Sequence, residues 1–311
     1  MDEKRIAVEK IKQELIKSGK IAQEINKTVR ITGMRYELPL PGRCLNMTYY
    51  QSMSENRPLM LGIHGGGFVN GGSSMDNNMW MTLCRTLNVN IASIDYRMAP
   101  EHKWPAAVLD IYDATLYLME HVEKFHFNKD KIFIFGCSAG GNLAAAACIY
   151  SGQKGKRLYK KQILIYPCTD FTKDPFSVSV KGTGAFSPEG LLAMRELYLN
   201  PEDYCKSTAS LVCASAEELK ILPPAIFCLA EKDVFLQEGL QYARMLEENG
   251  IPAARVIMEG MPHAYFENYY AEHIPEILLD DLTRQALQNG TIKNRCEETL
   301  AFIKRNLQGE I

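Results

Sequence analysis

The stretch from Lys131 to Tyr150, KIFIFGCSAGGNLAAAACIY, constrains the fold of this chain more than any other segment. It begins with a short apolar run, Ile132–Phe135, whose β-branched and aromatic residues are typical of a buried strand. The run breaks at Gly136, and the alanine-rich segment Asn142–Tyr150 favours a helix. The sequence therefore predicts a strand, a sharp turn and a helix in direct succession, with Ser138 at the turn.

Residues 136–140 on their own leave two interpretations of this turn open. Gly136-Cys137-Ser138-Ala139-Gly140 matches G-x-S-x-G, a pattern that holds a nucleophilic serine in a strained turn and exposes its Oγ at the end of the strand. A tight turn in which Ser138 only caps the helix uses the same residue types. The remaining sequence has to decide between a nucleophile and a turn residue.

Apolar and amphipathic segments alternate along most of the chain. Further strands are predicted at residues 35–40, 44–51, 59–63, 89–96, 162–166, 224–230 and 254–258. Helices are predicted at residues 3–28 with an interruption at Ser18-Gly19, and at 76–87, 106–125, 236–249, 271–288 and 292–307. Strands that alternate with helices form a mostly parallel sheet covered on both faces. We therefore expect one α/β domain over residues 1–311, into which the irregular segment 171–216 is inserted.

Four reactive side chains come directly after predicted strands, at the edge where α/β sheets bind their ligands. They are His64, Ser138, Asp233 and His263. A serine is a weak nucleophile unless a base lies within hydrogen-bond reach, and the base needs a carboxylate that holds its tautomer. We predict Ser138 as the nucleophile, Asp233 as the acid and His263 as the base.

Other residues compete for the acid and base positions. His273 is the alternative base, but it lies in a predicted helix rather than in a loop after a strand. Glu231 lies two residues before Asp233, and Asp170 follows the preceding strand. Asp233 is preferred because its loop leads directly into a helix, and one helix and one strand separate it from the predicted base. Its alternative role is that of a carboxylate at a helix N-terminus.

The run His64-Gly65-Gly66-Gly67 begins where a predicted strand ends. Glycines can turn their amides inward and let a substrate approach closely, because they lack Cβ. Attack on a carbonyl leaves an alkoxide, which needs N–H donors aimed at it. We predict Gly65, Gly66 and Ala139 as these oxyanion donors, and His64 as a brace of the loop. A merely flexible glycine loop is the alternative, but it does not explain why the run starts at a strand end.

Charge and cysteine content restrict the class of protein. The 311 residues carry a formal net charge of -2, which argues against a nucleic-acid or anionic membrane partner. The N-terminus has no apolar signal-peptide core, and no window is apolar enough to span a membrane. Nine cysteines without a C-x-x-C pair indicate reduced thiols in a cytoplasmic protein. No metal-ligand spacing is visible, and we expect neither a metal nor a cofactor.

Several motifs together resemble the hormone-sensitive-lipase-like branch of the α/β-hydrolase fold, the group IV esterases. The matching segments are HGGGF (64–68), DYRMAPEHKWPAA (95–107), GCSAGG (136–141) and LPP (222–224), followed by Asp233 and His263. The resemblance implies an α/β-hydrolase fold with a central, mostly parallel eight-stranded sheet, helices on both faces and a helical cap. It places the cap at about residues 1–40 and 171–216. We expect Asp95, Arg97 and Glu101 to brace the loop under the oxyanion glycines.

Two positions depart from the pattern of that family. Cys137 stands where the family usually has Asp or Thr, and Gln237 stands where it has a second carboxylate after Asp233. We interpret Cys137 as a buried spectator, because the turn exposes only the central serine. Gly182-Thr183-Gly184 and Tyr166 are predicted to line an acyl pocket.

The predicted function is that of a serine carboxylesterase, which hydrolyses short- to medium-chain acyl esters through an acyl-enzyme. A deacetylase of acetylated sugars and a small amidase are alternatives that use the same triad. A non-catalytic ligand receptor on the same fold is an alternative of another class, and His263 argues against it. The expected ligand is a small-molecule ester, with no nucleic-acid or membrane partner, and a homodimer is allowed for.

Overall fold

The computed structural model describes residues 3–177, 184–272, 274, 276–279 and 281–311. Its strands are β1 (Met34–Leu40), β2 (Arg43–Tyr50), β3 (Arg57–Ile63), β4 (Asn90–Asp95), β5 (Phe127–Cys137), β6 (Lys161–Ile165), β7 (Ala225–Ala230) and β8 (Ala253–Met258). The helices are α1 (Glu3–Thr28), α2 (Asn77–Leu87), α3 (Ala106–Glu120), α4 (Val122–Phe125), α5 (Ala139–Gln153), α6 (Pro188–Tyr198), α7 (Ala216–Leu219), α8 (Leu236–Glu248), α9 (Tyr265–Tyr270), α10 (Asp281–Gln288) and α11 (Thr291–Asn306). Short 3-10 turns lie at Pro175–Ser177, Gly184–Phe186, Pro201–Asp203, Leu211–Cys213 and Glu276–Leu278.

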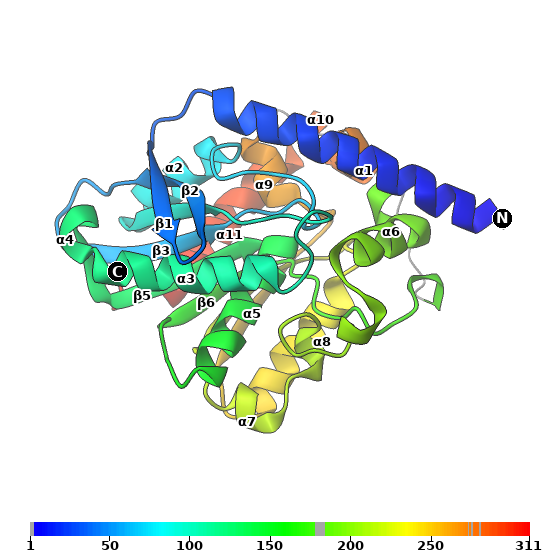
Figure 1. The fold of residues 1–311 in the computed structure, drawn as a ribbon. Helices are drawn as coiled ribbons and strands as arrows, with labels where there is room; N and C mark the ends of the chain where they lie inside the picture. Colours follow the sequence, from blue (N-terminus) through cyan, green and yellow to red (C-terminus); the bar gives the residue numbers. More distant parts are fainter. Residues whose placement is uncertain (1–2, 178–183, 273, 275, 280) are drawn as a thin grey trace.

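The strands form one sheet of eight, in the order β1-β2-β4-β3-β5-β6-β7-β8. Strand β2 runs antiparallel to both of its neighbours, and the pairs from β4 to β8 are parallel. The predicted fold class, a mostly parallel eight-stranded sheet with helices on both faces, is confirmed (Figure 1). The carboxyl ends of β3, β5 and β7 therefore meet at one edge of the sheet.

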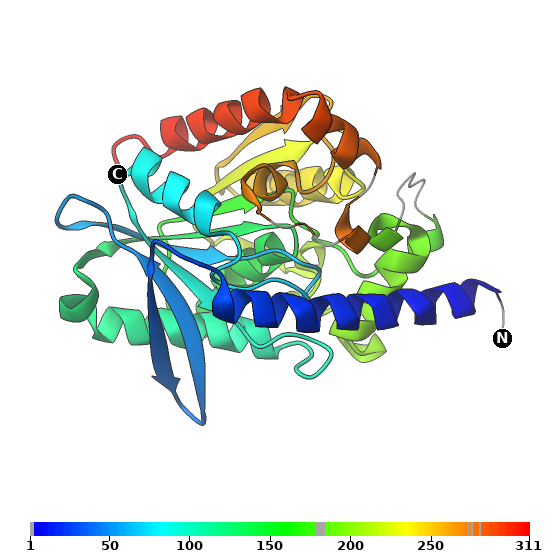
Figure 2. The same ribbon diagram turned by 90° about the horizontal axis from the view of Figure 1, so that it is seen from above.

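Alternating side chains explain how the sheet is covered on both faces. In β5, Ile132 and Ile134 pack into the core beneath α3, α5 and α8, whereas Phe133 and Phe135 pack with α2, α9 and α11 (Figure 2). Successive side chains of a strand point to opposite faces, so an apolar run such as Ile132–Phe135 is stable only between two helical layers. Each of these fully buried side chains contributes about 1.5–3 kcal/mol through the hydrophobic effect.

Two helix predictions were wrong in detail. Helix α1 continues through Ser18 and Gly19, where an interruption was expected. Gly19 is buried, and a Cβ atom there would lie 2.1 Å from the carbonyl oxygen of Val69, so this glycine serves a close contact and not a break. The single helix predicted at residues 271–288 is also wrong. Helix α9 ends at Tyr270, because Ala271 adopts an extended backbone with ψ 136°, and α10 begins only at Asp281.

The first of the two segments predicted to form a cap, residues 1–40, is divided between the sheet and a helix. Residues 34–40 belong to the sheet as its edge strand β1, whereas α1 runs beside α6 (Figures 1 and 2). Arg5 and Lys12 of α1 both form ion pairs with Glu196 of α6. Among the helices of the described ranges, none combines the length and the apolarity that a membrane span requires.

Candidate active site

Ser138 occupies the turn between β5 and α5. Its backbone has φ 55° and ψ -120°, a strained conformation that points the side chain away from both elements. The start of α5 approaches the end of β3 so closely that a Cβ atom at Gly140 would lie 2.2 Å from the carbonyl oxygen of Ile63. The peptide N–H of Ser138 still donates to the carbonyl of Ile165 at 2.9 Å, so β6 holds the turn in place. A glycine at position 140 is therefore a packing requirement of the turn.

Two hydrogen bonds join Ser138, His263 and Asp233. Ser138 Oγ lies 2.7 Å from His263 Nε2, and His263 Nδ1 lies 2.8 Å from Asp233 Oδ2. Asp233 can only accept when ionised, so Nδ1 carries the proton and Nε2 is free to accept from the serine hydroxyl. Asp233 Oδ1 accepts from the N–H of Phe235 at 2.9 Å, which fixes the carboxylate at the start of α8. The three predicted residues are thus in contact, although 125 positions separate Ser138 from His263.

None of the competing residues that the structure describes takes the place of Asp233 or His263. Glu231 is exposed, and its carboxylate accepts from the N–H of Gly260 at 2.7 Å. Asp170 forms an ion pair with Lys173 at 3.0 Å. His273 lies outside the described residues. Among the three candidate acids, the structure brings only Asp233 to His263.

The glycine run after β3 lies against the serine. A Cβ atom at Gly65 would lie 3.6 Å from Ser138 Cβ. Gly66 has φ 108°, a conformation that favours glycine, and a Cβ atom there would lie 2.1 Å from the carbonyl oxygen of Asn70. The N–H of Asn70 donates back to the carbonyl of Gly66 at 2.9 Å, which closes the loop into a tight turn. Ala139 follows Ser138 as the first residue of α5, so its amide belongs to the helix N-terminus.

The brace beneath this loop differs in part from the expectation. His64 is buried and stacks on Tyr96 with ring centroids 4.3 Å apart, and Tyr96 Oη donates to the His64 carbonyl at 3.0 Å. Asp95 accepts from Asn26 of α1 and from the N–H of Ser73, so it does brace the segment after the glycines. The other two predictions were wrong: Arg97 pairs with the buried Asp110 of α3, and Glu101 is exposed.

Glu267 was missed by the sequence analysis. It lies one helical turn after His263, on α9, and its carboxylate accepts from Tyr166 Oη. A Cβ atom at Gly65 would lie 3.0 Å from Glu267 Oε1, so this carboxyl reaches the glycine loop as well. Burial raises its pKa. No local signal marked it, because His263 lies in the turn before α9 and helical spacing does not relate the two side chains.

Tyr166 packs against the ring of His263, and Cys137 lies buried near Glu267. Cys137 is fully buried, and burial, followed by the neighbouring Glu267 carboxyl, raises the pKa of its thiol well above the usual value. The ring of Tyr166 lies 4.9 Å from the His263 ring, and its hydroxyl accepts from the N–H of Phe266 at 3.1 Å. Tyr166 does not line the pocket, so that expectation was wrong. Gly182 and Thr183, predicted to line it too, lie outside the described residues.

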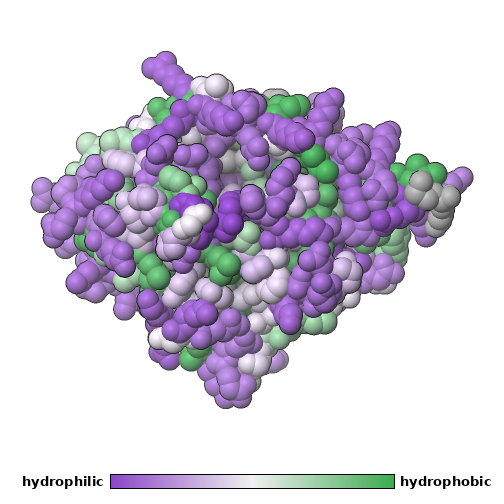
Figure 3. Space-filling view, in the orientation of Figure 1, coloured by the Kyte–Doolittle hydropathy of each residue, from purple (hydrophilic) through white to green (hydrophobic). Residues whose placement is uncertain are grey.

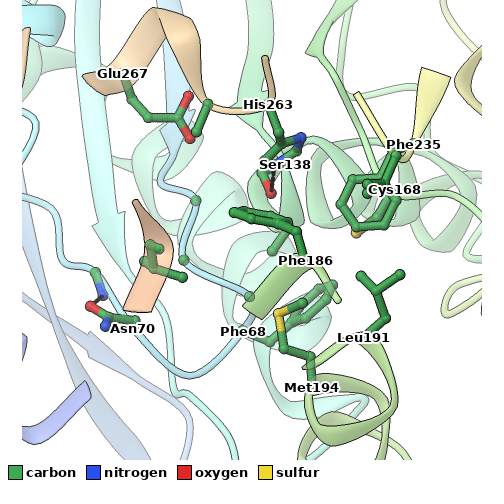
Figure 4. A pocket seen from close by; sticks show the side chains of 18 of the residues that line it. Phe68, Asn70, Ser138, Cys168, Phe186, Leu191, Met194, Phe235, His263 and Glu267 are labelled. Atoms are coloured by element: carbon green, nitrogen blue, oxygen red, sulfur yellow. Dashed lines mark hydrogen bonds between the residues drawn. The ribbon is translucent and has the colours of Figure 1, made fainter. Parts of the chain in front are cut away.

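A pocket opens at Ser138 and His263 and has two unlike sides (Figure 4). The labelled side chains below and to the right of the serine are mainly apolar: Phe68, Cys168, Phe186, Leu191, Met194 and Phe235. Glu267 and Asn70 lie to the left, and Asp76 and Asn268 line the pocket too. Within the described ranges, no group of three or more His, Cys, Asp or Glu side chains is arranged to hold a metal ion.

Comparison with known proteins finds relatives that belong to one family of hydrolases. The family model of the alpha/beta hydrolase fold matches residues 60–267. LipN of Mycobacterium tuberculosis, a carboxylic ester hydrolase, is 33% identical over 219 residues, which are 67% of this chain and 57% of LipN. An arylesterase of Saccharolobus solfataricus is 30% identical over 234 residues, 74% of this chain and 73% of that enzyme.

Solved structures support the same relationship. EstE1, a thermostable carboxylesterase cloned from a metagenomic library, superposes with a TM-score of 0.75 at 28% identity, covering 94% of this chain and 97% of EstE1. The match to the curated relatives is shorter: it spans less than two thirds of the length of LipN and of several others.

Proposed function

Because the chain belongs to the hormone-sensitive-lipase-like branch of the alpha/beta hydrolase fold family, we propose that it is a serine carboxylesterase. The observation that carries the proposal is the continuous pair of hydrogen bonds from Ser138 through His263 to Asp233. A serine, a histidine in the correct tautomer and a buried carboxylate in contact are what acyl transfer through a serine requires. Carboxylesterase and arylesterase relatives support an ester as the substrate.

In the first half of the reaction, Ser138 Oγ attacks the ester carbonyl carbon while its proton passes to His263 Nε2. The carbonyl oxygen takes up the electron pair, and the N–H groups of Gly65, Gly66 and Ala139 stabilise the resulting anion. Asp233 stabilises the imidazolium that forms. The tetrahedral intermediate then expels the alcohol, which takes the proton from His263, and an acyl-enzyme remains.

In the second half, water takes the place of the alcohol. His263 accepts a proton from the water, whose oxygen attacks the acyl carbon, and the same three N–H groups stabilise the anion again. Collapse of this intermediate returns the proton to Ser138 Oγ and releases the carboxylic acid. Each oxyanion donor is worth about 10²–10³ in rate in enzymes where one has been removed.

We propose an acyl ester of short to medium chain length as the substrate. Its apolar side is bounded by aromatic rings, of which Phe186 and Phe235 lie 4.9 Å and 5.1 Å from the His263 ring. We propose that α1 and residues 171–216 act as the cap over this pocket, because Leu191 and Met194 of α6 line it and α1 packs on α6. Acetylated sugars and small amides remain alternative substrates for the same residues, and a panel of acyl chain lengths beside sugar acetates separates them.

The proposal is tested at Ser138. We expect Ser138→Ala to lower hydrolysis of p-nitrophenyl acetate to the uncatalysed background, and to abolish covalent labelling by a fluorophosphonate probe. Ser151→Ala is the matched control, because Ser151 is a buried serine of the same helix whose Oγ donates to the Lys156 carbonyl far from the pocket. Retention of most activity in Ser138→Ala would exclude the serine mechanism, and unlabelled wild type would favour the receptor alternative.

The remaining proposals concern the location, the ligand and the oligomeric state of the protein. Its nine cysteines are free thiols, and burial raises the pKa of most of the buried ones, as at Cys148 and Cys228. Free, unreactive thiols are typical of a reducing compartment, which supports a cytoplasmic location. A small-molecule ester as the ligand and a homodimer stay predictions of the sequence.

A further inference from the structure

The polar side of the pocket contains a carboxyl group with no partner. Asp76 precedes α2 and lines the pocket, yet its side chain makes no hydrogen bond or ion pair with any residue that the structure describes. Burial, followed by the charge of Glu267, raises the pKa of Asp76 to about 7. A carboxyl group that is withdrawn from water normally has a compensating donor or cation beside it. Asp76 lacks one, although it faces a space open to a ligand.

Glu267 is the second carboxyl group on this side. Tyr166 Oη satisfies one of its oxygens, while Oε1 is turned toward the Gly65 loop. The two carboxyl groups act on each other, since the charge of Glu267 raises the pKa of Asp76. Two like charges at one buried place repel each other unless a positive charge lies between them.

Asn268, next to Glu267 on α9, gives an independent sign that a ligand belongs here. Only 8% of its surface is exposed, it lines the same pocket, and its Nδ2 has no hydrogen-bond partner among the described residues. Buried side-chain amides are nearly always satisfied, and an orphan at a pocket wall is explained by a molecule that the site takes up. The unpartnered Nδ2 is a donor, so this molecule must present an acceptor atom to Asn268 in addition to a positive charge for the two carboxyl groups.

The basic groups that line the pocket are engaged elsewhere. Lys173 pairs with Asp170 at 3.0 Å. Arg195 donates to the carbonyl oxygens of Phe171 and Lys173 at 3.2 Å and 2.8 Å. In the described part of the chain, no ion pair joins Asp76 or Glu267 to a lysine or arginine. A metal ion is a poor candidate for the missing charge, because the described residues offer no cluster of metal ligands.

We propose that Asp76 and Glu267 form a subsite for a protonated amine of the substrate, beside which Asn268 donates to a substrate oxygen. The ester would carry an apolar group for the side lined by Phe68, Phe186 and Phe235 and an ammonium group for the side on which Glu267 lies, with Ser138 between the two sides (Figure 4). An ammonium group has a positive charge and N–H donors, which match the two carboxyl groups, and an oxygen of the same ester would accept from Asn268 Nδ2. The inference rests on the proposed esterase function and names its substrate class.

A pair of esters of equal shape tests the subsite. One is the butyrate of dimethylaminoethanol, which is protonated at neutral pH, and the other is the butyrate of isoamyl alcohol, its uncharged isostere. We expect the wild type to prefer the cationic ester, measured as the ratio of the two kcat/KM values. The double variant Asp76→Asn/Glu267→Gln should lower this ratio by about tenfold or more, which is the effect of losing roughly 1.4 kcal/mol of selective binding.

Single variants and a charge control complete the design. Asp76→Asn and Glu267→Gln should each lower the ratio, so the test survives if the double variant does not fold. Asp170→Asn removes a carboxyl group from the same pocket that is already paired with Lys173, and it should leave the ratio near that of the wild type.

The outcomes separate the two proposals. An unchanged ratio in the single and double variants, or an equal fall in Asp170→Asn, would overturn the ammonium subsite. Hydrolysis of both esters that persists in Ser138→Ala would instead overturn the esterase mechanism itself.

Discussion

At the scale of single residues, Asp76 carries a carboxyl group whose burial costs stability. Its pKa is 3.8 in an unperturbed chain and about 7 in the folded protein, because burial disfavours the carboxylate. The folded state therefore binds the proton more tightly than the unfolded state does, and folding stability falls as the pH rises from about 4 to about 7. Such a cost is common where a binding site needs an unpaired charge.

Asp76→Asn should accordingly stabilise the protein above neutral pH. We expect its Tm at pH 8 to exceed that of the wild type by about 3 °C or more, and the two to converge near pH 3 and below, where Asp76 is largely protonated in both states. Differential scanning calorimetry at both pH values measures the difference. Asp130→Asn, at an exposed position, is the control and should show no comparable gain. A variant less stable than the wild type at pH 8 would contradict the buried, unpaired carboxylate.

At the scale of elements, helix α1 is docked directly on the oxyanion loop. Gly19 touches the Val69 carbonyl, and Ser18 Oγ accepts from Asn70 Nδ2 at 2.6 Å, so the helix contacts the residues that follow Gly66. Asn26 extends the contact to Ser74 and Asp95. The helix thus holds the loop from outside.

Gly19→Ala separates helix propensity from packing. In a free helix this change stabilises by about 1 kcal/mol, but here the new Cβ would lie 2.1 Å from the Val69 oxygen. We expect a lower Tm and a fall in kcat/KM of about threefold or more, because displacement of the loop disturbs the oxyanion donors. Lys20→Ala, on the exposed side of the same helix, should change neither. Stabilisation by Gly19→Ala would show that α1 is not seated on the loop.

At the scale of the whole molecule, Asp110 connects strand β2 to the segment after β4. This α3 side chain is fully buried and binds Arg43 of β2 at 2.6 Å and Arg97 at 2.8 Å. It also accepts from the N–H of Arg97 at 2.8 Å. The face of the molecule in Figure 3 is mostly hydrophilic, with apolar residues in small separate groups.

Asp110→Asn should destabilise the whole chain, because it leaves two arginines beside a neutral group. Breaking a buried pair costs about 3–5 kcal/mol, which urea unfolding would detect as a lower midpoint with an unchanged slope. Asp113→Asn is the matched control: Asp113 binds only Arg43 among the described residues, and its side chain is 28% exposed, so its loss should cost much less. Equal costs for the two variants would argue against a central role of Asp110.

The sequence by itself determined the order of the elements and the residues at the strand ends. Apolar runs such as Ile132–Phe135 need helices on both faces, and parallel strands bring their carboxyl ends to one edge, so Ser138, Asp233 and His263 could be predicted to meet. Their contact follows from topology, which hydrophobic periodicity encodes locally. The family resemblance, confirmed by the comparisons, rests on the same segments.

Only the tertiary structure decided what surrounds these residues. The pairing of Arg97 with Asp110, the contact of Gly19 with Val69 and the presence of Asp76 and Glu267 in one pocket each depend on how separate elements pack together. No local pattern marks such pairs, because a carboxyl group or a glycine has the same appearance in the sequence whether it is solvated or buried. Burial changes the free energy of a charge by several kcal/mol, and burial is a property of the packed molecule alone.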